Sequence, residues 1–133
     1  MQNNKFSVFP KDIKMFLLTC SHAFLWYIPD KPEITTHPQG VTPKEGNNAT
    51  VSCNAIGNPS PSITWTKNGS IISTAGDPRS TFGADNKSLT ITNVSRADSG
   101  QYQCVASNNL GKATSNAATI DVQCMFIVVQ KFS

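Results

Sequence analysis

The side chains that could do chemistry in this chain are few: four cysteines, two histidines and eight carboxylates. His22 lies in an apolar run and His37 stands beside Pro38, and neither belongs to a recognisable metal-binding or catalytic-triad motif. The sequence also contains no GxGxxG loop, no phosphate-binding P-loop and no CxxC pair. These residue types and spacings predict no enzyme, no catalytic residue, no cofactor and no metal site.

One stretch near the end of the chain, RADSGQYQCVASN at residues 96–108, places a tyrosine two positions before a cysteine. In a β-strand, residues two apart point to the same face, so Tyr102, Cys104 and Ala106 would all look inward. The alternation therefore predicts a half-buried strand. Such a strand requires other strands whose apolar faces cover it.

The composition is typical of many short strands joined by turns. The 133 residues suffice for one domain, only 14% of them are charged, and Ser, Thr, Asn, Gly and Pro are abundant. Residues 31–123 carry seven basic and six acidic side chains, so most of the excess positive charge lies at the two ends. We expect one all-β domain without the basic patch that nucleic-acid binding requires.

Short runs rich in β-branched residues recur between turn signals across residues 31–123. The pair Asn68-Gly69 predicts a tight hairpin, and the two prolines of residues 57–61 predict a loop. The strands are expected at residues 33–36, 48–55, 62–67, 70–73, 80–84, 88–92, 100–107 and 113–122. The expected core consists of Val51, Cys53, Ala55, Ile63, Trp65, Leu89, Ile91, Tyr102, Cys104, Ala106, Ile120 and Val122.

Three features at fixed spacing point to a known family. Cys53, Trp65 twelve residues after it, and the run DSGQYQC at residues 98–104 together resemble the signature of the immunoglobulin domain. The resemblance covers residues 31–123, and the combination is specific although each feature alone is weak. It implies an all-β fold, an immunoglobulin-like Greek-key β-sandwich.

The resemblance also implies roles for individual residues. Cys53 and Cys104 would form a disulfide between the two sheets, with Trp65 packed upon it. Tyr102 would form a tyrosine corner, in which its hydroxyl bonds back to the backbone of the preceding turn near Asp98. We expect these side chains to build the fold and to take no part in catalysis.

The subtype follows from the distance between the cysteines. Fifty residues leave little room for the extra strand pair of an antibody variable domain, so the sequence resembles the I-set better. Pro38 would break the first strand, so that its second half moves to the other sheet as in that set. Arg79 and Asp98 match positions at which the family often places a salt bridge.

The implied disulfide favours an oxidising compartment, either the cell exterior or the secretory lumen. Four N-glycosylation sequons also fall inside the domain. Their asparagines are Asn48, Asn68, Asn86 and Asn93. Because the domain is rich in Asn, Ser and Thr, chance alone would supply most of these sequons. Asparagine is also favoured in turns for backbone reasons, so both explanations stay open.

The two ends do not share the strand pattern, and we expect residues 1–30 to be a leader and residues 124–133 to be a tail. Residues 15–28 follow three lysines and are largely apolar, as in a signal peptide, but no good cleavage site follows them. The apolar run at residues 124–129 is far too short to span a bilayer. Both ends are expected to lie outside the domain.

An alternative interpretation treats both ends as translated intron. Codons for residues 123–126 can contain GTATGT, a typical splice donor, and codons for residues 28–30 can contain a CAG acceptor after a pyrimidine-rich run. On this hypothesis Cys20 and Cys124 are intron-encoded and form no second disulfide. The signal-peptide and intron interpretations both stay open.

Two classes of function remain. The resemblance favours an extracellular protein-binding or cell-adhesion module, one repeat of a larger adhesion, receptor or hemicentin-like matrix protein. The alternative is an intracellular structural I-set module of a giant muscle-type protein. The expected partners are another protein, in a homophilic or heterophilic contact, and neighbouring immunoglobulin domains in tandem. A membrane would be reached only through segments that this chain does not contain.

If the module binds a protein, its surface should include outward residues of the second sheet and two loops, residues 58–61 and 108–111. The sheet residues are Thr64, Thr66, Gln101, Gln103, Val105 and Ser107. A face that is merely solvated is the alternative, and it stays open.

Overall fold

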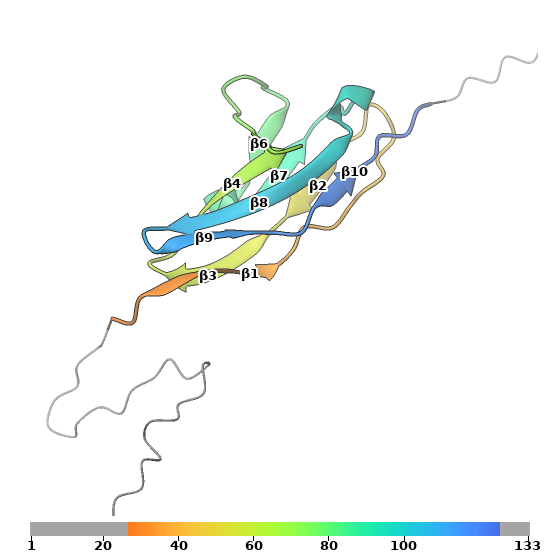
Figure 1. Cartoon of the computed structure of the whole chain (residues 1–133). Helices are drawn as coiled ribbons and strands as arrows, with labels where there is room; N and C mark the ends of the chain where they lie inside the picture. The colour runs from red at the N-terminus through yellow and green to blue at the C-terminus, as the bar shows by residue number, and fades with distance from the viewer. Residues whose placement is uncertain (1–26, 126–133) are drawn as a thin grey trace, which may run out of the picture.

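The structure is a computed structural model that describes residues 27–125 (Figure 1). The strands are β1 (Asp30–Thr36), β2 (Ala49–Ser52), β3 (Asn54–Asn58), β4 (Ser62–Lys67), β5 (Ser70–Ile71), β6 (Ser80–Phe82), β7 (Ser88–Ile91), β8 (Gly100–Asn108), β9 (Gly111–Thr114) and β10 (Ala118–Ile120). Two short 3-10 turns, η2 (Ala84–Asn86) and η3 (Arg96–Asp98), precede β7 and β8.

The strands form two layers that face each other (Figure 1). In the layer that we call the β2 sheet, β2, β7 and β6 lie side by side, and β3 continues β2 to pair with β1. In the layer that we call the β8 sheet, the order is β10, β8, β4 and β5, and β9 also pairs with β8. The pairings between these strands are all antiparallel. The predicted all-β immunoglobulin-like sandwich is therefore confirmed.

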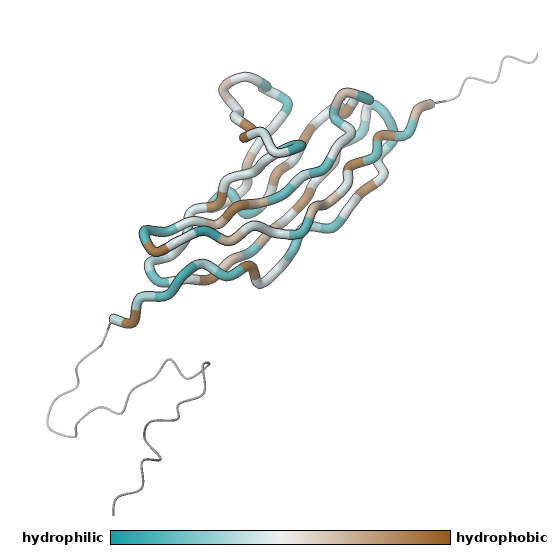
Figure 2. The backbone as a smooth tube through the Cα atoms, viewed as in Figure 1, coloured by the Kyte–Doolittle hydropathy of each residue, from teal (hydrophilic) through white to brown (hydrophobic). Residues whose placement is uncertain are grey.

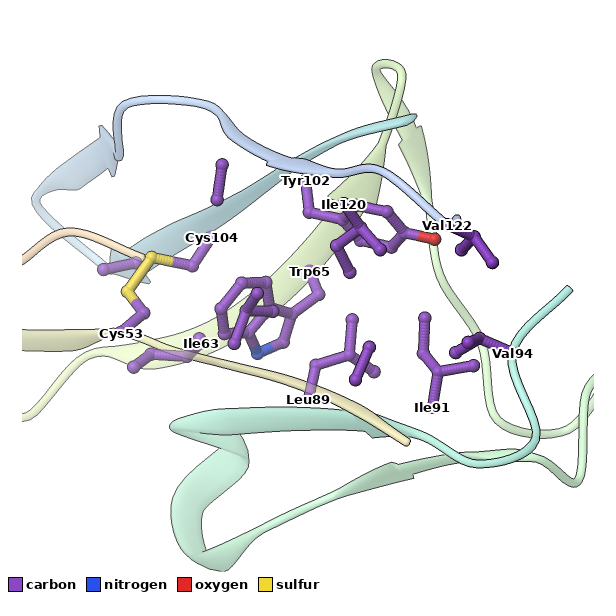
Figure 3. Packing of buried hydrophobic residues seen from close by; sticks show 14 residues of the cluster. Cys53, Ile63, Trp65, Leu89, Ile91, Val94, Tyr102, Cys104, Ile120 and Val122 are labelled. Carbon is purple, nitrogen blue, oxygen red and sulfur yellow. A yellow bond between two sulfur atoms is a disulfide. The ribbon is translucent and has the colours of Figure 1, made fainter. Parts of the chain in front are cut away.

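Alternation along the strands places the apolar side chains between the layers. In β8 Tyr102, Cys104 and Ala106 are buried, and in β4 Ile63 and Trp65 are buried opposite Ala106 and Cys104. Figure 2 shows apolar and polar segments following one another at short intervals along the strands. The buried cluster (Figure 3) consists of Ala49, Val51, Cys53, Ile63, Trp65, Leu89, Ile91, Val94, Tyr102, Cys104, Ala106, Ala118, Ile120 and Val122.

This cluster differs from the expected core at four positions. Ala49, Val94 and Ala118 are buried although alternation did not select them. Val94 lies in the connection between β7 and β8, where a strand pattern carries no information about burial. Ala55 was expected in the core but is only partly buried, because it lines an open cleft at one end of the sandwich.

The strand expected at residues 48–55 is two strands, β2 and β3, with a break at Cys53. The break marks a change of partner, since β2 pairs with β7 whereas β3 pairs with β1. The backbone N–H of Cys53 still donates to the carbonyl oxygen of Lys87 at 2.8 Å, so the chain stays in the β2 sheet. The strands expected at residues 70–73 and 80–84 are real but shorter, as β5 and β6.

The strand expected at residues 113–122 is also interrupted, between β9 and β10. At the interruption the Cys104 N–H donates to the side-chain oxygen of Ser115 at 3.0 Å, and the Ser115 N–H donates to the Cys104 carbonyl at 2.9 Å. A serine hydroxyl thus takes the place of a backbone acceptor in the ladder. β10 then resumes pairing with β8 nearer the start of that strand.

The predicted break at Pro38 is confirmed. β1 ends at Thr36, and beyond the proline Val41 and Lys44 form isolated parallel bridges with Ile120 and Gln123. The chain therefore leaves the β2 sheet and joins the edge of the β8 sheet, as expected for the I-set.

The chain enters and leaves at opposite ends of the sandwich (Figure 1). β1 begins at Asp30, one residue before the expected domain boundary, and Asn58 donates its side-chain N–H to the carbonyl oxygen of Ile28 at 2.7 Å. We call the end at which residue 27 enters the entry end and the other the exit end. The expectations for residues 1–26 and 126–133, Cys20 included, lie outside the described residues.

Candidate binding surface and the framework that carries it

The disulfide joins the two sheets within the core, on one side of Trp65 (Figure 3). The Cα atoms of Cys53 and Cys104 are 6.4 Å apart, and both residues are almost fully buried. Trp65 is completely buried in the same cluster, and its indole Nε1–H donates to the carbonyl oxygen of Asn86 at 2.7 Å. The indole thus has the polar partner that a buried tryptophan requires, and it fastens η2 to the core.

The hydroxyl of Tyr102 donates to the carbonyl oxygen of Asp98 at 2.7 Å, within a buried environment. This is the geometry of a tyrosine corner, and it joins β8 to η3. Burial and the nearby Asp98 carboxylate both disfavour the phenolate, which raises the pKa of Tyr102 to about 12. Tyr102 is therefore a neutral hydrogen-bond donor in the fold.

Asp98 collects charged and backbone donors at the exit end. Its carboxylate accepts two hydrogen bonds from the guanidinium of Arg79, at 2.9 and 3.1 Å, and one from the Ser95 N–H at 2.8 Å. Burial alone would raise the pKa of Asp98, but these donors and the Arg79 charge outweigh it and hold the pKa below its usual value. The same guanidinium also contacts Asp77 at 3.1 Å. The salt bridge expected from the resemblance is thus a three-residue group.

These titratable side chains are therefore engaged within the fold. His37 accepts a hydrogen bond from the Asn116 N–H at its Nδ1, at 3.0 Å, and so ties the Pro38 crossover to the β9–β10 interruption. Across residues 27–125, no three His, Cys, Asp or Glu side chains lie close enough together to hold a metal ion. In the same residues no helix has the length and apolarity needed to cross a membrane.

The outward surface of the β8 sheet brings the expected binding residues together. Val105 lies between Thr64 of β4 and Thr114 of β9 in the strand register, and Thr66 lies opposite Gln103. We define the β8 face as Thr64, Thr66, Gln101, Gln103, Val105, Ser107 and Thr114. None of these side chains is charged, and all are half-buried or exposed, while the exposed Lys112, opposite Ser107 on β9, borders the face.

The two loops that were expected to bind also hold the entering chain in place. Asn108 donates its side-chain N–H to the carbonyl oxygens of Asp30 and Pro59, at 2.8 and 3.0 Å, so it fastens the entering chain to both loops. Its own oxygen accepts from the Leu110 N–H at 2.9 Å, an Asx turn that the Asn-Asn-Leu-Gly sequence could have signalled. No sequence signal predicts the hydrogen bond from Asn108 to Asp30, because the two residues are 78 positions apart.

A cleft of about 450 Å³ opens beside one of these loops at the entry end. It is lined by Ala55, Ser60, Pro61, Ser62, Ile63, Asp85, Asn86 and Lys87. The sequence indicated the loop at residues 58–61 but not the cleft, since η2 comes from a distant part of the chain.

The four sequon asparagines lie on exposed turns or at the start of a strand. Asn68, Asn86 and Asn93 have positive φ angles of 48°, 56° and 52°. Asparagine tolerates that conformation better than other residues with a Cβ atom, so the backbone alone explains these three. Asn48 is not among the positive-φ residues of the described chain.

Comparison with known families gives one match over most of the sandwich. The family described as "Immunoglobulin domain" matches residues 31–108. Among curated proteins, protein turtle homolog B of Rattus norvegicus is 44% identical over 78 residues, which is 59% of this chain and 6% of the relative. The peroxidasin homolog of Mus musculus is 37% identical over 91 residues, or 68% of this chain and 6% of the relative.

Neural cell adhesion molecule L1 of Takifugu rubripes is 38% identical over 104 residues, which is 71% of this chain and 8% of the relative. The chain thus spans less than a tenth of the length of these three proteins. What they share with it is one segment of a much longer molecule.

Solved structures give the same fold. The N-terminal Ig1-2 module of the Drosophila receptor protein tyrosine phosphatase DLAR aligns with a TM-score of 0.64 and 35% identity, covering 69% of this chain and 45% of the module. The titin domains z1z2, solved in complex with telethonin, align with a TM-score of 0.67 and 33% identity, covering 74% of this chain and 50% of theirs. Both are tandem arrangements, of which this chain matches about one half.

Proposed function

Because this chain belongs to the immunoglobulin domain family, we propose that it is an extracellular protein-binding module, one repeat of a larger adhesion or receptor protein. Its resemblance to segments of neural cell adhesion molecule L1 and of a receptor protein tyrosine phosphatase supports this proposal. The entry and exit of the chain at opposite ends suit a tandem arrangement (Figure 1). The Cys53–Cys104 disulfide suits an oxidising compartment.

The absence of charged side chains around Val105, at the centre of the β8 face, is the observation that carries the binding proposal. The centres of protein interfaces are depleted of charged residues, because each buried charge must be desolvated. Val105 is an apolar side chain on the outward surface, flanked by threonines on both neighbouring strands. We therefore place the contact at the β8 face, centred on Val105, with another protein as the partner.

A charge introduced at the centre of this face tests the proposal. Beads coated with the full chain would be scored for self-aggregation and for attachment to cells of the source tissue. Val105→Lys should weaken attachment by about tenfold or more, the loss typical of a central interface residue. Ser52→Lys is the matched control, because Ser52 is exposed on the opposite sheet. Equal attachment by both variants, or none by the wild-type chain, would count against the β8 face.

An intracellular structural module is the second candidate, and the resemblance to titin z1z2 favours it. Thiol chemistry separates the two candidates, because the cytosol keeps cysteines reduced. Protein from its native tissue would be alkylated before reduction and analysed by peptide mass spectrometry. We expect Cys53 and Cys104 to be unlabelled. Full alkylation of both would favour the intracellular module.

A further inference from the structure

Asn48 differs from the other sequon asparagines in how its side-chain amide is used. The sugar of an N-linked glycan is carried by Nδ2, so an accessible site needs that nitrogen directed to solvent. Asn86 donates Nδ2–H to the carbonyl oxygen of Ile63 at 3.3 Å. The Asn68 oxygen accepts from the Gln101 N–H at 2.9 Å, and its Nδ2 packs against Gly100, 3.1 Å from where a Cβ would stand. Both nitrogens therefore face the protein.

Asn48 uses only its side-chain oxygen in contacts with the protein. Its Oδ1 accepts a hydrogen bond from the backbone N–H of Asn93 at 3.3 Å. A backbone donor requires the oxygen at that position, so Nδ2 takes no part in this contact. Within residues 27–125 this nitrogen has no hydrogen-bond partner, and Asn48 is exposed. The hydroxyl residue of the sequon, Thr50, is exposed on the same outward side of β2.

The contact between Asn48 and Asn93 also places these two sequons side by side. The Asn93 backbone is bound directly to the Asn48 side chain, so a glycan on Asn48 would cover Asn93. Asn93 is held by a positive φ angle, and its carbonyl oxygen accepts from Arg79 at 3.3 Å. The positive φ angle of Asn93 thus gives a structural reason for asparagine at that position, whereas Asn48 has no positive φ angle.

We propose that Asn48 is the N-glycosylation site of this domain, and that Asn68, Asn86 and Asn93 serve the turns in which they lie. The reaction joins Asn48 Nδ2 to the anomeric carbon of a lipid pyrophosphate-linked oligosaccharide. The bond between that carbon and the pyrophosphate oxygen breaks, the lipid pyrophosphate leaves, and Nδ2 gives up one proton. This inference rests on the proposed extracellular function, because the donor is present only in the secretory pathway.

The position of Asn48 has a consequence for binding. By alternation Asn48 points to the outward side of the β2 sheet, whereas the β8 face lies on the opposite side of the sandwich. Its turn is also joined to the exit of the chain, where the Glu45 N–H donates to the Gln123 carbonyl at 2.9 Å. A glycan at Asn48 would shield the β2 sheet at the exit end and leave the β8 face open to a partner.

Site mapping in cultured animal cells tests the assignment. The full chain, directed to the endoplasmic reticulum by an added signal sequence, would be treated with peptide-N-glycosidase in heavy-oxygen water. Peptide mass spectrometry then identifies each formerly occupied asparagine as labelled aspartate. Asn48→Asp and Asn93→Asp form a matched pair, since both keep a side-chain oxygen and suit a turn. The wild-type chain and Asn93→Asp should carry sugar at Asn48, and Asn48→Asp should carry none.

Three results would overturn the assignment: an unmodified Asn48, sugar at any of the other three asparagines in the wild-type chain, or sugar retained by Asn48→Asp. Chain isolated from native tissue separates this inference from the proposed function. If native chain is unmodified while the directed chain carries sugar at Asn48, the extracellular placement fails and the site assignment is supported.

Discussion

At the scale of single residues, one buried hydroxyl connects β8 to the turn before it. Tyr102 is 1% exposed, and its hydroxyl donates to the Asp98 carbonyl at 2.7 Å. A phenylalanine would fill the same space but would leave that carbonyl without its donor. The cost of an unsatisfied buried polar group exceeds the net gain of an ordinary hydrogen bond.

Tyr102→Phe should therefore lower the free energy of unfolding by about 1 to 3 kcal/mol. The measurement is the urea midpoint of the full chain, followed by fluorescence. Tyr27→Phe is the control, because Tyr27 is 61% exposed and should leave the midpoint unchanged. Equal midpoints for the two variants would show that the hydroxyl bond contributes nothing.

Single residues were the most predictable level of this molecule. The spacing of Cys53, Trp65, Tyr102 and Cys104 reports alternation within strands and a family resemblance, and both depend on local sequence. Asn108 shows where local information ends. Its side chain joins segments 49 and 78 residues away, and no pattern in the flanking sequence specifies those partners.

At the scale of elements, η3 depends on Asp98 at its end and Ser95 before its start. The backbone N–H of Ser95 donates to the Asp98 carboxylate at 2.8 Å, as in a capping box, and the Ser95 hydroxyl donates a second hydrogen bond to it at 3.2 Å. Arg79 adds two further hydrogen bonds from the segment before β6. One carboxylate thus holds a turn and a strand together.

Acid should weaken these contacts by protonating the Asp98 carboxylate. The pKa of Asp98 is lower in the folded chain than in the unfolded chain, so its stabilisation is complete above about pH 4 and is lost as pH falls. The melting temperature of the wild-type chain should fall as the pH is lowered below about 4. Asp98→Asn should cost about 1 to 3 kcal/mol at pH 7 and flatten that dependence.

Thermal unfolding at a series of pH values checks this prediction. Asp85→Asn is the control, since Asp85 is exposed on η2. The control should follow the wild-type curve. If Asp98→Asn shows the same acid slope as the wild-type chain, other carboxylates are responsible for it.

Strand boundaries were less predictable than strand existence. Alternation reports which residues face inward, but it carries no information about which neighbour a strand pairs with. The change of partner at Cys53 and the interruption at Ser115 both arise from contacts with distant strands. The strand pattern therefore predicted one strand where the structure has β2 and β3, and one where it has β9 and β10.

At the scale of the whole molecule, the entering segment is part of the sandwich. Asp30 pairs with Asn58 at the start of β1, Asn108 donates to the Asp30 carbonyl, and Asn58 donates to the Ile28 carbonyl. A fragment of residues 31–123 lacks both carbonyl acceptors. Length and composition carry no information about these contacts, so they could not place the first residue of β1.

A fragment of residues 31–123 should still unfold in one cooperative transition. Its stability should be lower than that of residues 27–125 by about 1 to 3 kcal/mol, the contribution of two hydrogen bonds. Urea unfolding of the two fragments beside the full chain measures the difference. A much larger loss would show that the entering segment is a major part of the fold, and no loss would show that its bonds are irrelevant to stability.

The disulfide has a mechanical consequence for a module whose chain enters at one end and leaves at the other. Tension applied at those ends passes through the bond between Cys53 and Cys104, which are 51 residues apart in sequence. At about 3.4 Å per extended residue, the bond withholds roughly 170 Å of contour length from stretching. An oxidised module that is pulled open can therefore lengthen only through the segments outside the two cysteines. The segment between them becomes extensible only when the disulfide is reduced.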